Sequence, residues 1–137
     1  MGIDCIMDQP ARTPDTMNDN LIHTLQLRLR KFARERDWEQ FHSPKNLAMA
    51  LTVEAAELLE IFQWLSPEDS ANLTQKQQQQ ASEELADVLL YLCRLADVLD
   101  IDLAGAAEEK LQLNTAKYPA DEVRGSSAKR SLLQDQD

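Results

Sequence analysis

Glycine and cysteine are scarce in this sequence, with 3 Gly and 2 Cys among 137 residues. Cys5 and Cys93 lie far apart, and no CxxC pair or Cys/His zinc spacing occurs. A disulfide framework is therefore not expected, and a reducing cytoplasm is the simplest setting. β-Branched residues are also few, since Ile, Val and Thr together reach 15 against 21 Leu and 16 Ala. This balance disfavours an all-β protein and favours helices.

Positive charge and long apolar runs are lacking as well. The chain has 14 Lys and Arg against 24 Asp and Glu, which gives a formal net charge of −10. A general nucleic-acid binder needs a clustered basic surface, so we expect no nucleic-acid polymer as a partner. The longest near-continuous apolar stretch, residues 88–93, is far shorter than a membrane span, and the N-terminal residues show no secretory-signal pattern. We therefore expect a cytoplasmic protein without a membrane partner.

The chain is predicted to form one helical domain over residues 18–119, between a flexible N-terminal arm (1–17) and a flexible C-terminal tail (120–137). Apolar periodicity predicts four main helices over residues 18–36, 44–65, 74–99 and 103–117. Ser43-Pro44 and Asp102 are typical helix starts, and Tyr118-Pro119 is a typical stop. Because the connections are short, we expect an all-α fold, an antiparallel helical bundle.

Acidic residues stand in the apolar stripes of the second and third predicted helices. At 100° per residue, Leu47, Leu58, Ile61 and Leu65 fall within about 40° of Glu54, and Glu57 lies about 60° away. Glu60 is expected on the opposite side, facing water. With Glu84 as the origin, Val88, Tyr91 and Leu95 fall within about 40°, and Asp87 lies about 60° away. Each helix therefore presents an acidic pair at i and i+3 to its partner.

These pairs predict a metal site. Ionised carboxylates at a helix interface lose hydration and repel each other, so Glu54, Glu57, Glu84 and Asp87 need a compensating charge. Oxygen-only ligands suit Mg²⁺, with Mn²⁺ as a second candidate, and Mg²⁺ commonly bridges carboxylates to substrate phosphates. Two alternatives stay open at this point. Either pair can be a solvated helix face, or the acids can form interface salt bridges with Arg28, Arg30 or Lys110.

The fourth predicted helix carries a second candidate group. Lys110, Asn114 and Lys117 fall within about 60° of one another and can meet phosphates. The ordinary alternative is that lysines near a helix C-terminus complement the helix dipole.

The few aromatic residues include two tryptophans near the ends of the second predicted helix. Trp38 and Phe41 lie in the loop before it, with His42 beside them, and Trp64 lies at its end. Core packing is the default role of any one of them, but a loop Trp and a helix-end Trp near a metal site can also stack a base. Tyr91 follows Asp87 by four residues, so its hydroxyl is a candidate phosphate donor.

Four blocks of sequence resemble the MazG-like nucleotide pyrophosphohydrolases, most closely the small dCTP pyrophosphatase branch. The blocks are RERDWEQFHSPKNL at residues 34–47, VEAAELLEIFQW at 53–64, EELADVLLY at 83–91 and KLQLNTAKYP at 110–119. The resemblance covers residues 21–119. The sequence departs from some dCTP-preferring relatives at Leu29, where they carry His, and this leaves the base preference open.

The resemblance implies an all-α fold, Mg²⁺ dependence and hydrolysis of a nucleoside triphosphate to the monophosphate and pyrophosphate. It implies that Glu54, Glu57, Glu84 and Asp87 hold the metal and that Trp38 and Trp64 help to form the base pocket. Tyr91, Lys110 and Asn114 are implied to contact phosphates or sugar, and His42, Lys117 and Tyr118 are further substrate-binding candidates. The resemblance also implies a homo-oligomer, a dimer or tetramer, that completes the bundle.

Two functional hypotheses follow. In the first, the protein is a Mg²⁺-dependent pyrophosphohydrolase of deoxynucleotides such as dCTP or modified dNTPs, with Glu57 as the base and Lys110 stabilising transition-state charge. In the second, it is a non-catalytic helical oligomerisation or regulatory module that binds nucleotide or metal. The intact acidic pairs favour the first, because a module without catalysis has no need of four inward carboxylates.

Overall fold

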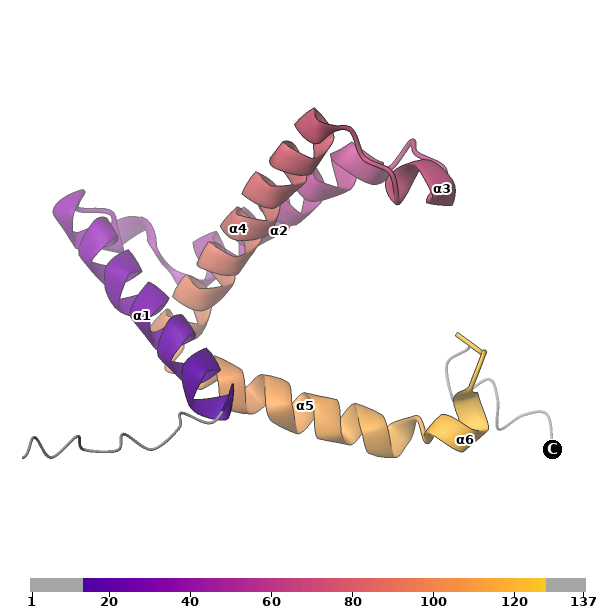
Figure 1. Cartoon of the computed structure of the whole chain (residues 1–137). Helices are drawn as coiled ribbons and strands as arrows, with labels where there is room; N and C mark the ends of the chain where they lie inside the picture. Colours follow the sequence, from indigo (N-terminus) through magenta and orange to yellow (C-terminus); the bar gives the residue numbers. More distant parts are fainter. Residues whose placement is uncertain (1–13, 128–137) are drawn as a thin grey trace, which may run out of the picture. The chain divides into compact units, whose positions relative to one another are not determined.

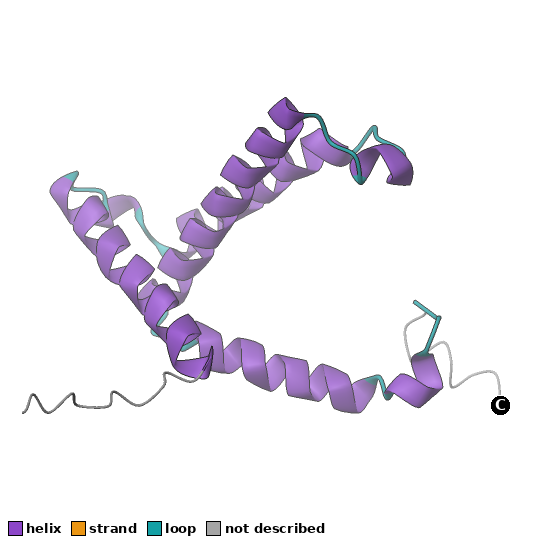
Figure 2. Cartoon of the chain, viewed as in Figure 1, coloured by secondary structure: helices purple, strands orange, loops and turns teal. Residues whose placement is uncertain are grey.

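The computed structural model describes residues 14–127 of the chain, with side chains from residue 21 onward. Residues 1–13 and 128–137 lie outside the described part, so the flexibility predicted for them stays a prediction. Every regular element within residues 14–127 is helical (Figures 1 and 2), which confirms the all-α prediction. The elements are α1 (Pro14–Glu35), the 3₁₀ turn η1 (Glu39–Phe41), α2 (Pro44–Phe62), α3 (Pro67–Ser70), α4 (Gln75–Val98), α5 (Leu103–Lys117) and α6 (Ala120–Val123).

The start of α2 confirms the predicted cap at Ser43, and the start of α4 shows a further capping residue, Thr74. The Ser43 hydroxyl accepts a hydrogen bond from the Asn46 backbone N–H at 3.2 Å, and Pro44 occupies the first turn of α2. Thr74 forms a reciprocal capping box with Gln77 at the start of α4. These contacts satisfy backbone N–H groups that a helix leaves unpaired at its first turn, which is why the sequence indicates these starts.

The helix ends differ from the prediction by a few residues. Helix α1 begins at Pro14, ahead of the predicted start at residues 18–20, because proline suits the first position of a helix. Helix α2 ends at Phe62, before the predicted residue 65. The short helix α6 lies at the start of the predicted tail, directly after Pro119. Helices α1 and α4 are each followed closely by an aspartate in the left-handed region, Asp37 (φ 56°) and Asp100 (φ 53°).

The chain divides into two compact units, the first ending at Asp100 and the second beginning at Ile101. In the first unit α4 packs along α2, antiparallel to it, and also against α1 (Figure 1). The buried hydrophobic residues of the described chain are mostly small: Ala33, Leu47, Ala81, Cys93 and Ala96. Small side chains allow close approach of the helices but bury little apolar area.

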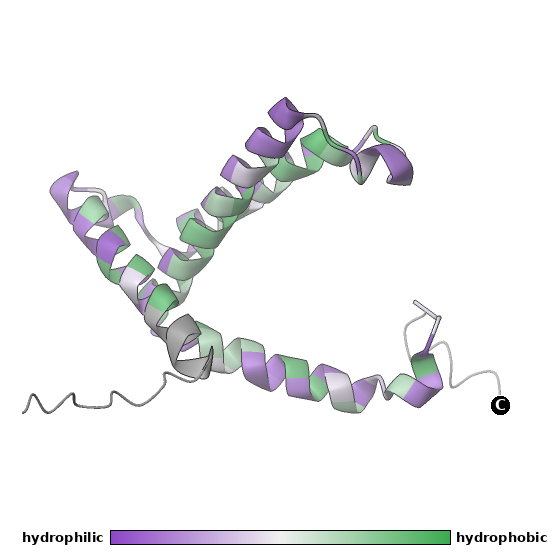
Figure 3. Cartoon of the chain, viewed as in Figure 1, coloured by the Kyte–Doolittle hydropathy of each residue, from purple (hydrophilic) through white to green (hydrophobic). Residues whose placement is uncertain are grey.

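Several large apolar side chains of the first unit are exposed, because the contacts between its helices bury mostly small residues. Leu59 is 58% exposed, Leu85 56% and Trp64 87%. Hydrophobic residues follow α2 and the C-terminal half of α4, whereas the first turns of α4 are hydrophilic (Figure 3). Contiguous exposed apolar surface on a small domain is typical of a face that another surface covers.

The described part of the second unit contains α5 and the short α6. Helix α5 starts at the predicted cap, where the Asp102 carboxylate accepts a hydrogen bond from the Gly105 backbone N–H at 3.1 Å. Leu111 and Leu113 on α5 are more than 60% exposed (61% and 64%). No helix within residues 14–127 has the length and apolar character needed to cross a bilayer.

Candidate active site

Three carboxylates of the first unit converge between α2 and α4. Glu54 comes from α2, and Glu84 and Asp87 come from successive turns of α4. One oxygen of each lies within 4.8 Å of the others. Glu54 and Glu84 are partly buried, and Asp87 is exposed. This acidic cluster has the oxygen donors that a hard divalent cation prefers, gathered closely enough that they could share one ion.

The electrostatics of the acidic cluster are unfavourable without a cation. Burial raises the pKa of Glu54, and the charges of Asp87, Glu57 and Glu84 raise it further. Burial also raises the pKa of Glu84, followed by the charges of neighbouring acids, Glu57 first. The Glu84 Oε2 atom is buried and has no hydrogen-bond partner within the described part of the chain. A buried, unpartnered carboxylate oxygen is costly unless a ligand completes it.

Within the described part of the first unit, the salt-bridge alternative is wrong for this cluster, and the pairing with Lys110 stays a prediction because Lys110 lies in the second unit. Among the described side chains of the first unit, no Lys or Arg forms an ion pair with Glu54, Glu84 or Asp87. Arg30, one of the proposed partners, pairs with Asp97 instead. The acids can therefore take an external cation.

Glu57 lies beside the cluster rather than within it. It lines a hollow of about 460 Å³ next to Glu84, and its charge raises the Glu84 pKa. Glu60 is exposed to water, as expected, but it lines the same hollow and also raises the Glu84 pKa, so its predicted placement on the opposite side was wrong. Six residues at 100° place Glu60 about 60° beyond Glu57, on the same margin of the helix. The helical projection contained this signal.

A pocket of about 460 Å³ adjoins the acidic cluster in the first unit. Asp87 belongs to both, and Tyr91 lines the pocket one helical turn further along α4. Trp38 forms one wall and packs edge-to-face on Phe32, with ring centroids 5.8 Å apart and an interplanar angle of 74°. The remaining lining residues are Leu25, Arg28, Leu29, His42, Leu90 and Arg94. The pocket thus combines aromatic and aliphatic walls with a charged end, which suits a base joined to phosphates.

Four of the ten residues that line this pocket were predicted from the sequence as site residues, and Arg94 was missed. Trp38, His42 and Tyr91, all predicted to bind substrate, line it. Arg94 follows Asp87 by seven residues, and this spacing places both on one face of α4, so the signal was present. Arg94 is 8% exposed, an unusual burial for an arginine.

Other predicted residues are not part of this pocket. Trp64 is not among its lining residues. Lys110, Asn114 and Lys117 lie on α5 in the second unit, followed by Tyr118, whose ring has the Lys117 Nζ atom 5.4 Å from its centroid. Their approach to the substrate stays a prediction, as does the role of Trp64.

The fold and the acidic cluster define a class of all-α proteins with carboxylates gathered between two helices, where they could hold a metal ion, and sequence comparison assigns the family. Residues 49–133 match the MazG-like family. The chain belongs to this family.

Two mammalian relatives extend the comparison. The chain is 45% identical over 105 residues to the dCTP pyrophosphatase 1 proteins of Rattus norvegicus and Homo sapiens. The match covers 75% of this chain and 62% of each relative, so the chain spans under two thirds of their length.

A solved structure of a pyrophosphatase from Archaeoglobus fulgidus DSM 4304 has a similar fold, with a TM-score of 0.66 and 38% identity. The similarity covers 81% of this chain and 99% of the archaeal chain. It therefore includes nearly the whole of a protein that is itself described as a pyrophosphatase.

Proposed function

We propose that the protein is a Mg²⁺-dependent nucleoside triphosphate pyrophosphohydrolase, which converts a (d)NTP and water to the (d)NMP and pyrophosphate. The observation that carries the proposal is the acidic cluster of Glu54, Glu84 and Asp87, which adjoins a pocket with aromatic walls and has no cationic partner among the described side chains of the first unit. The names of the relatives, dCTP pyrophosphatase 1 and pyrophosphatase, support the same reaction class.

The residues present fit a divalent cation. The buried Glu84 Oε2 atom has no partner among the described residues, and the donor set is all oxygen, as Mg²⁺ prefers. Glu54, Glu84 and Asp87 would hold the ion, with Glu57 beside them. The bound ion supplies charge that offsets the triphosphate and polarises its phosphoryl oxygens.

The protein's own residues orient the nucleotide. Trp38 offers a face for the base, and Tyr91 lies near Asp87, where its hydroxyl can donate to a phosphate oxygen. Glu57 is our candidate for the base that accepts a proton from the attacking water. Lys110 would stabilise charge that develops in the transition state, and Asn114, Lys117 and Tyr118 would contact phosphates or sugar.

The preferred substrate in this proposal is a deoxynucleotide such as dCTP or a modified dNTP. The relatives named for dCTP support this choice. Leu29 lines the pocket with Leu25 and Leu90, so this wall is apolar and offers the base no hydrogen bond. A methylated or otherwise more apolar base fits such a wall.

The working unit in this proposal is a homo-oligomer, a dimer or tetramer. Its support is the exposed apolar surface of α2 and α4, together with Trp64 at 87% exposure. A neighbouring subunit that covers Trp64 would also complete a site that one chain leaves open.

A panel of canonical and modified NTPs and dNTPs, incubated with Mg²⁺ and scored for every phosphate product, tests the proposal. Monophosphate plus pyrophosphate, abolished by EDTA, is the expected result. Glu57→Gln and Asp87→Asn should remove turnover while the oligomer survives. Glu83→Gln is the matched control, since it removes one charge from an exposed neighbour outside the cluster. A folded oligomer that turns over nothing with Mg²⁺ or Mn²⁺ would instead favour the non-catalytic binding module.

A further inference from the structure

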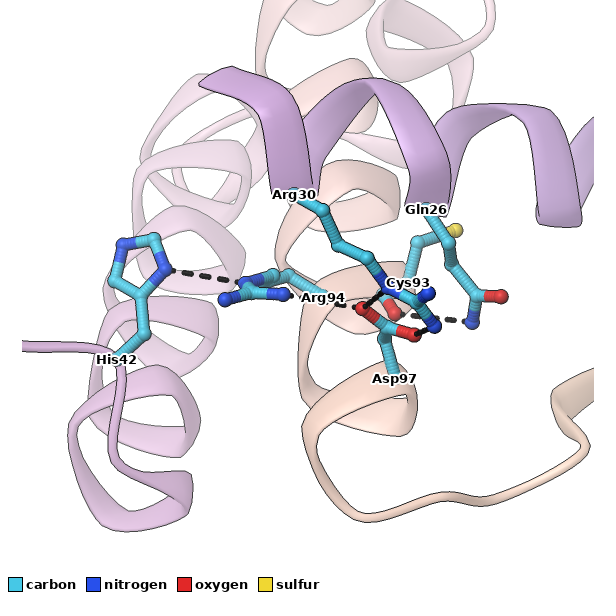
Figure 4. A network of polar contacts seen from close by, with 6 residues as sticks. All are labelled: Gln26, Arg30, His42, Cys93, Arg94 and Asp97. Carbon is cyan, nitrogen blue, oxygen red and sulfur yellow. Dashed lines mark hydrogen bonds and ion pairs between the residues drawn. The ribbon is translucent and has the colours of Figure 1, made fainter. Parts of the chain in front are cut away.

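A second charged network adjoins the pocket, about two helical turns along α4 from Asp87. The buried Arg94 side chain lies between His42 and Asp97 (Figure 4). Arg94 Nε–H donates to His42 Nδ1 at 3.1 Å, and Arg94 Nη1–H donates to Asp97 Oδ2 at 3.0 Å. His42 and Arg94 both line the pocket, so this network forms part of its wall.

The network fixes which ring nitrogen of His42 carries the hydrogen. An N–H donor aimed at Nδ1 requires a lone pair there, so the neutral ring carries its hydrogen on Nε2. Protonation of Nδ1 would lose this hydrogen bond and place two cations in contact. Burial and the Arg94 charge together lower the pKa of His42, against a smaller opposite effect of Glu39. His42 therefore presents one defined group, an Nε2–H donor.

Helix α1 also helps to fix the position of Arg94, because it binds the Asp97 carboxylate that accepts from Arg94. Arg30 on α1 forms a bidentate ion pair with Asp97. Arg30 Nε–H donates to Oδ2 at 2.8 Å, and Arg30 Nη2–H donates to Oδ1. One helical turn earlier on α1, the Gln26 side-chain amide donates to the Cys93 carbonyl at 3.2 Å, which ties α1 to α4 at the same level (Figure 4). The Asp97 carboxylate thus has both oxygens occupied, and Arg94 has one orientation open to it.

We propose that Arg94 is a positioning residue that holds His42 as a hydrogen-bond donor, through Nε2, to an acceptor on the nucleobase in the pocket. The acceptor is a carbonyl oxygen or ring nitrogen at the edge of the base. This inference rests on the proposed function for the identity of the ligand, but the fixed tautomer is a property of the protein alone.

The tautomer can be measured directly because the chain has only 2 histidines. His23 is exposed and serves as the internal reference for an unrestrained ring. Long-range ¹H–¹⁵N spectra of the full-length ¹⁵N-labelled protein near neutral pH should show His42 with a hydrogen on Nε2 alone and His23 with averaged signals. A His42 ring that averages both tautomers, or carries its hydrogen on Nδ1, overturns the inference without touching the proposed function.

Kinetics with dCTP and Mg²⁺ test the donor role. Arg94→Met should release the His42 tautomer and raise KM about tenfold with kcat within about threefold, the loss expected for one hydrogen bond made in both the ground and transition states. Lys31→Met removes an exposed ion pair on α1, outside the pocket, and should leave both constants unchanged.

Two histidine variants keep the test decisive if Arg94→Met fails to fold. A glutamine amide reaches the Nε2 position, so His42→Gln should keep KM within about threefold, whereas the shorter amide of His42→Asn reaches only the Nδ1 position and should raise KM about tenfold. Equal KM values for the two variants overturn the donor role. A wild-type protein that hydrolyses no nucleotide overturns the proposed function and, with it, the proposal that His42 binds a nucleobase. The spectra still decide in that case whether the His42 tautomer is fixed.

Discussion

Helix α4 carries two carboxylate sites with opposite electrostatics. Near its middle, Glu84 and Asp87 face Glu54 of α2, and no cation of the first unit's described side chains pairs with them. Near its end, Asp97 accepts from Arg30 and Arg94 together. The pKa of Glu84 is raised by burial and by neighbouring acids, whereas the Arg30 hydrogen bond is the largest effect that lowers the pKa of Asp97.

The two sites differ in how their carboxylate oxygens are paired. Within the described part of the chain, Glu84 has an oxygen that lacks a partner and needs a ligand, whereas Asp97 is paired by arginines of the protein itself. The Glu84 Oε2 atom has no hydrogen-bond partner among the described residues. The Asp97 side chain is only 5% exposed and has a guanidinium on each side. We infer that the first site stores unfavourable energy that a bound cation relieves, while the second stabilises the packing of α1 on α4.

The largest effect is expected from Asp97→Asn, which removes the acceptor and leaves buried Arg94 without its counter-charge. The free energy of unfolding should fall by about 3 kcal/mol, the lower end for breaking one side of a buried ion pair. Urea unfolding followed by circular dichroism measures it. A loss below about 1 kcal/mol would mean that Asp97 contributes no more than a surface pair.

Neutralising a carboxylate of the acidic cluster should have the opposite effect on stability. Glu84→Gln should lower turnover by about 100-fold or more, because metal-ion catalysis supplies several kcal/mol to the transition state. In EDTA the same variant should be more stable than wild type, since it removes charge repulsion from a partly buried site. Steady-state kinetics and thermal unfolding with EDTA measure the two effects, and a variant that loses both turnover and stability would contradict the comparison.

A divalent cation should stabilise the wild-type protein through the acidic cluster. At 100 times its dissociation constant, Mg²⁺ should add about 2.7 kcal/mol to the free energy of unfolding. The Glu84→Gln variant should lose most of this increment, whereas Asp97→Asn should keep it. Thermal unfolding across a Mg²⁺ titration gives the result, and equal increments in the two variants would place the ion elsewhere.

The lowered pKa of Asp97 also predicts how the stability of the folded protein depends on acidic pH. Its pKa in the folded protein is lowered from the ordinary 3.8, so its contribution to stability is complete above that value and is lost as pH falls through the folded pKa. Below about pH 4 the difference in stability between wild type and Asp97→Asn should therefore shrink. Urea midpoints measured at decreasing pH test this, and a difference that stays constant would argue against the lowered pKa.

The smallest effect is expected from Lys31→Met on the exposed face of α1. Lys31 and Glu35 form an ion pair with side chains that are 73% and 52% exposed. Such pairs are worth under about 1 kcal/mol, so the unfolding free energy should change by less than about 0.5 kcal/mol. A change as large as that of Asp97→Asn would remove the distinction between buried and exposed pairs on α1.

Local sequence rules predict the helices and the acidic cluster well. Cap residues such as Ser43 and Thr74 act within one turn, and helical periodicity alone places Glu54, Glu84 and Asp87 toward the helix interface. The same rules fail by a few residues at helix ends, and the expected side of α2 for Glu60 was wrong although its helical angle indicates the hollow. Contacts within one helix are therefore the part that sequence alone specifies.

The partners of Arg94 and Arg30 could not be inferred from sequence. Arg30 and Asp97 are 67 residues apart, and His42 and Arg94 are 52 apart, so no periodicity connects them. By sequence alone Arg30 is as good a partner for the acidic cluster as for Asp97. The sequence determined the helices, the faces that they bury and the family, because these depend on short-range spacing. Only the tertiary structure decided which carboxylate receives the arginines and which is left for a cation, because that choice depends on how α1 and α2 pack against α4.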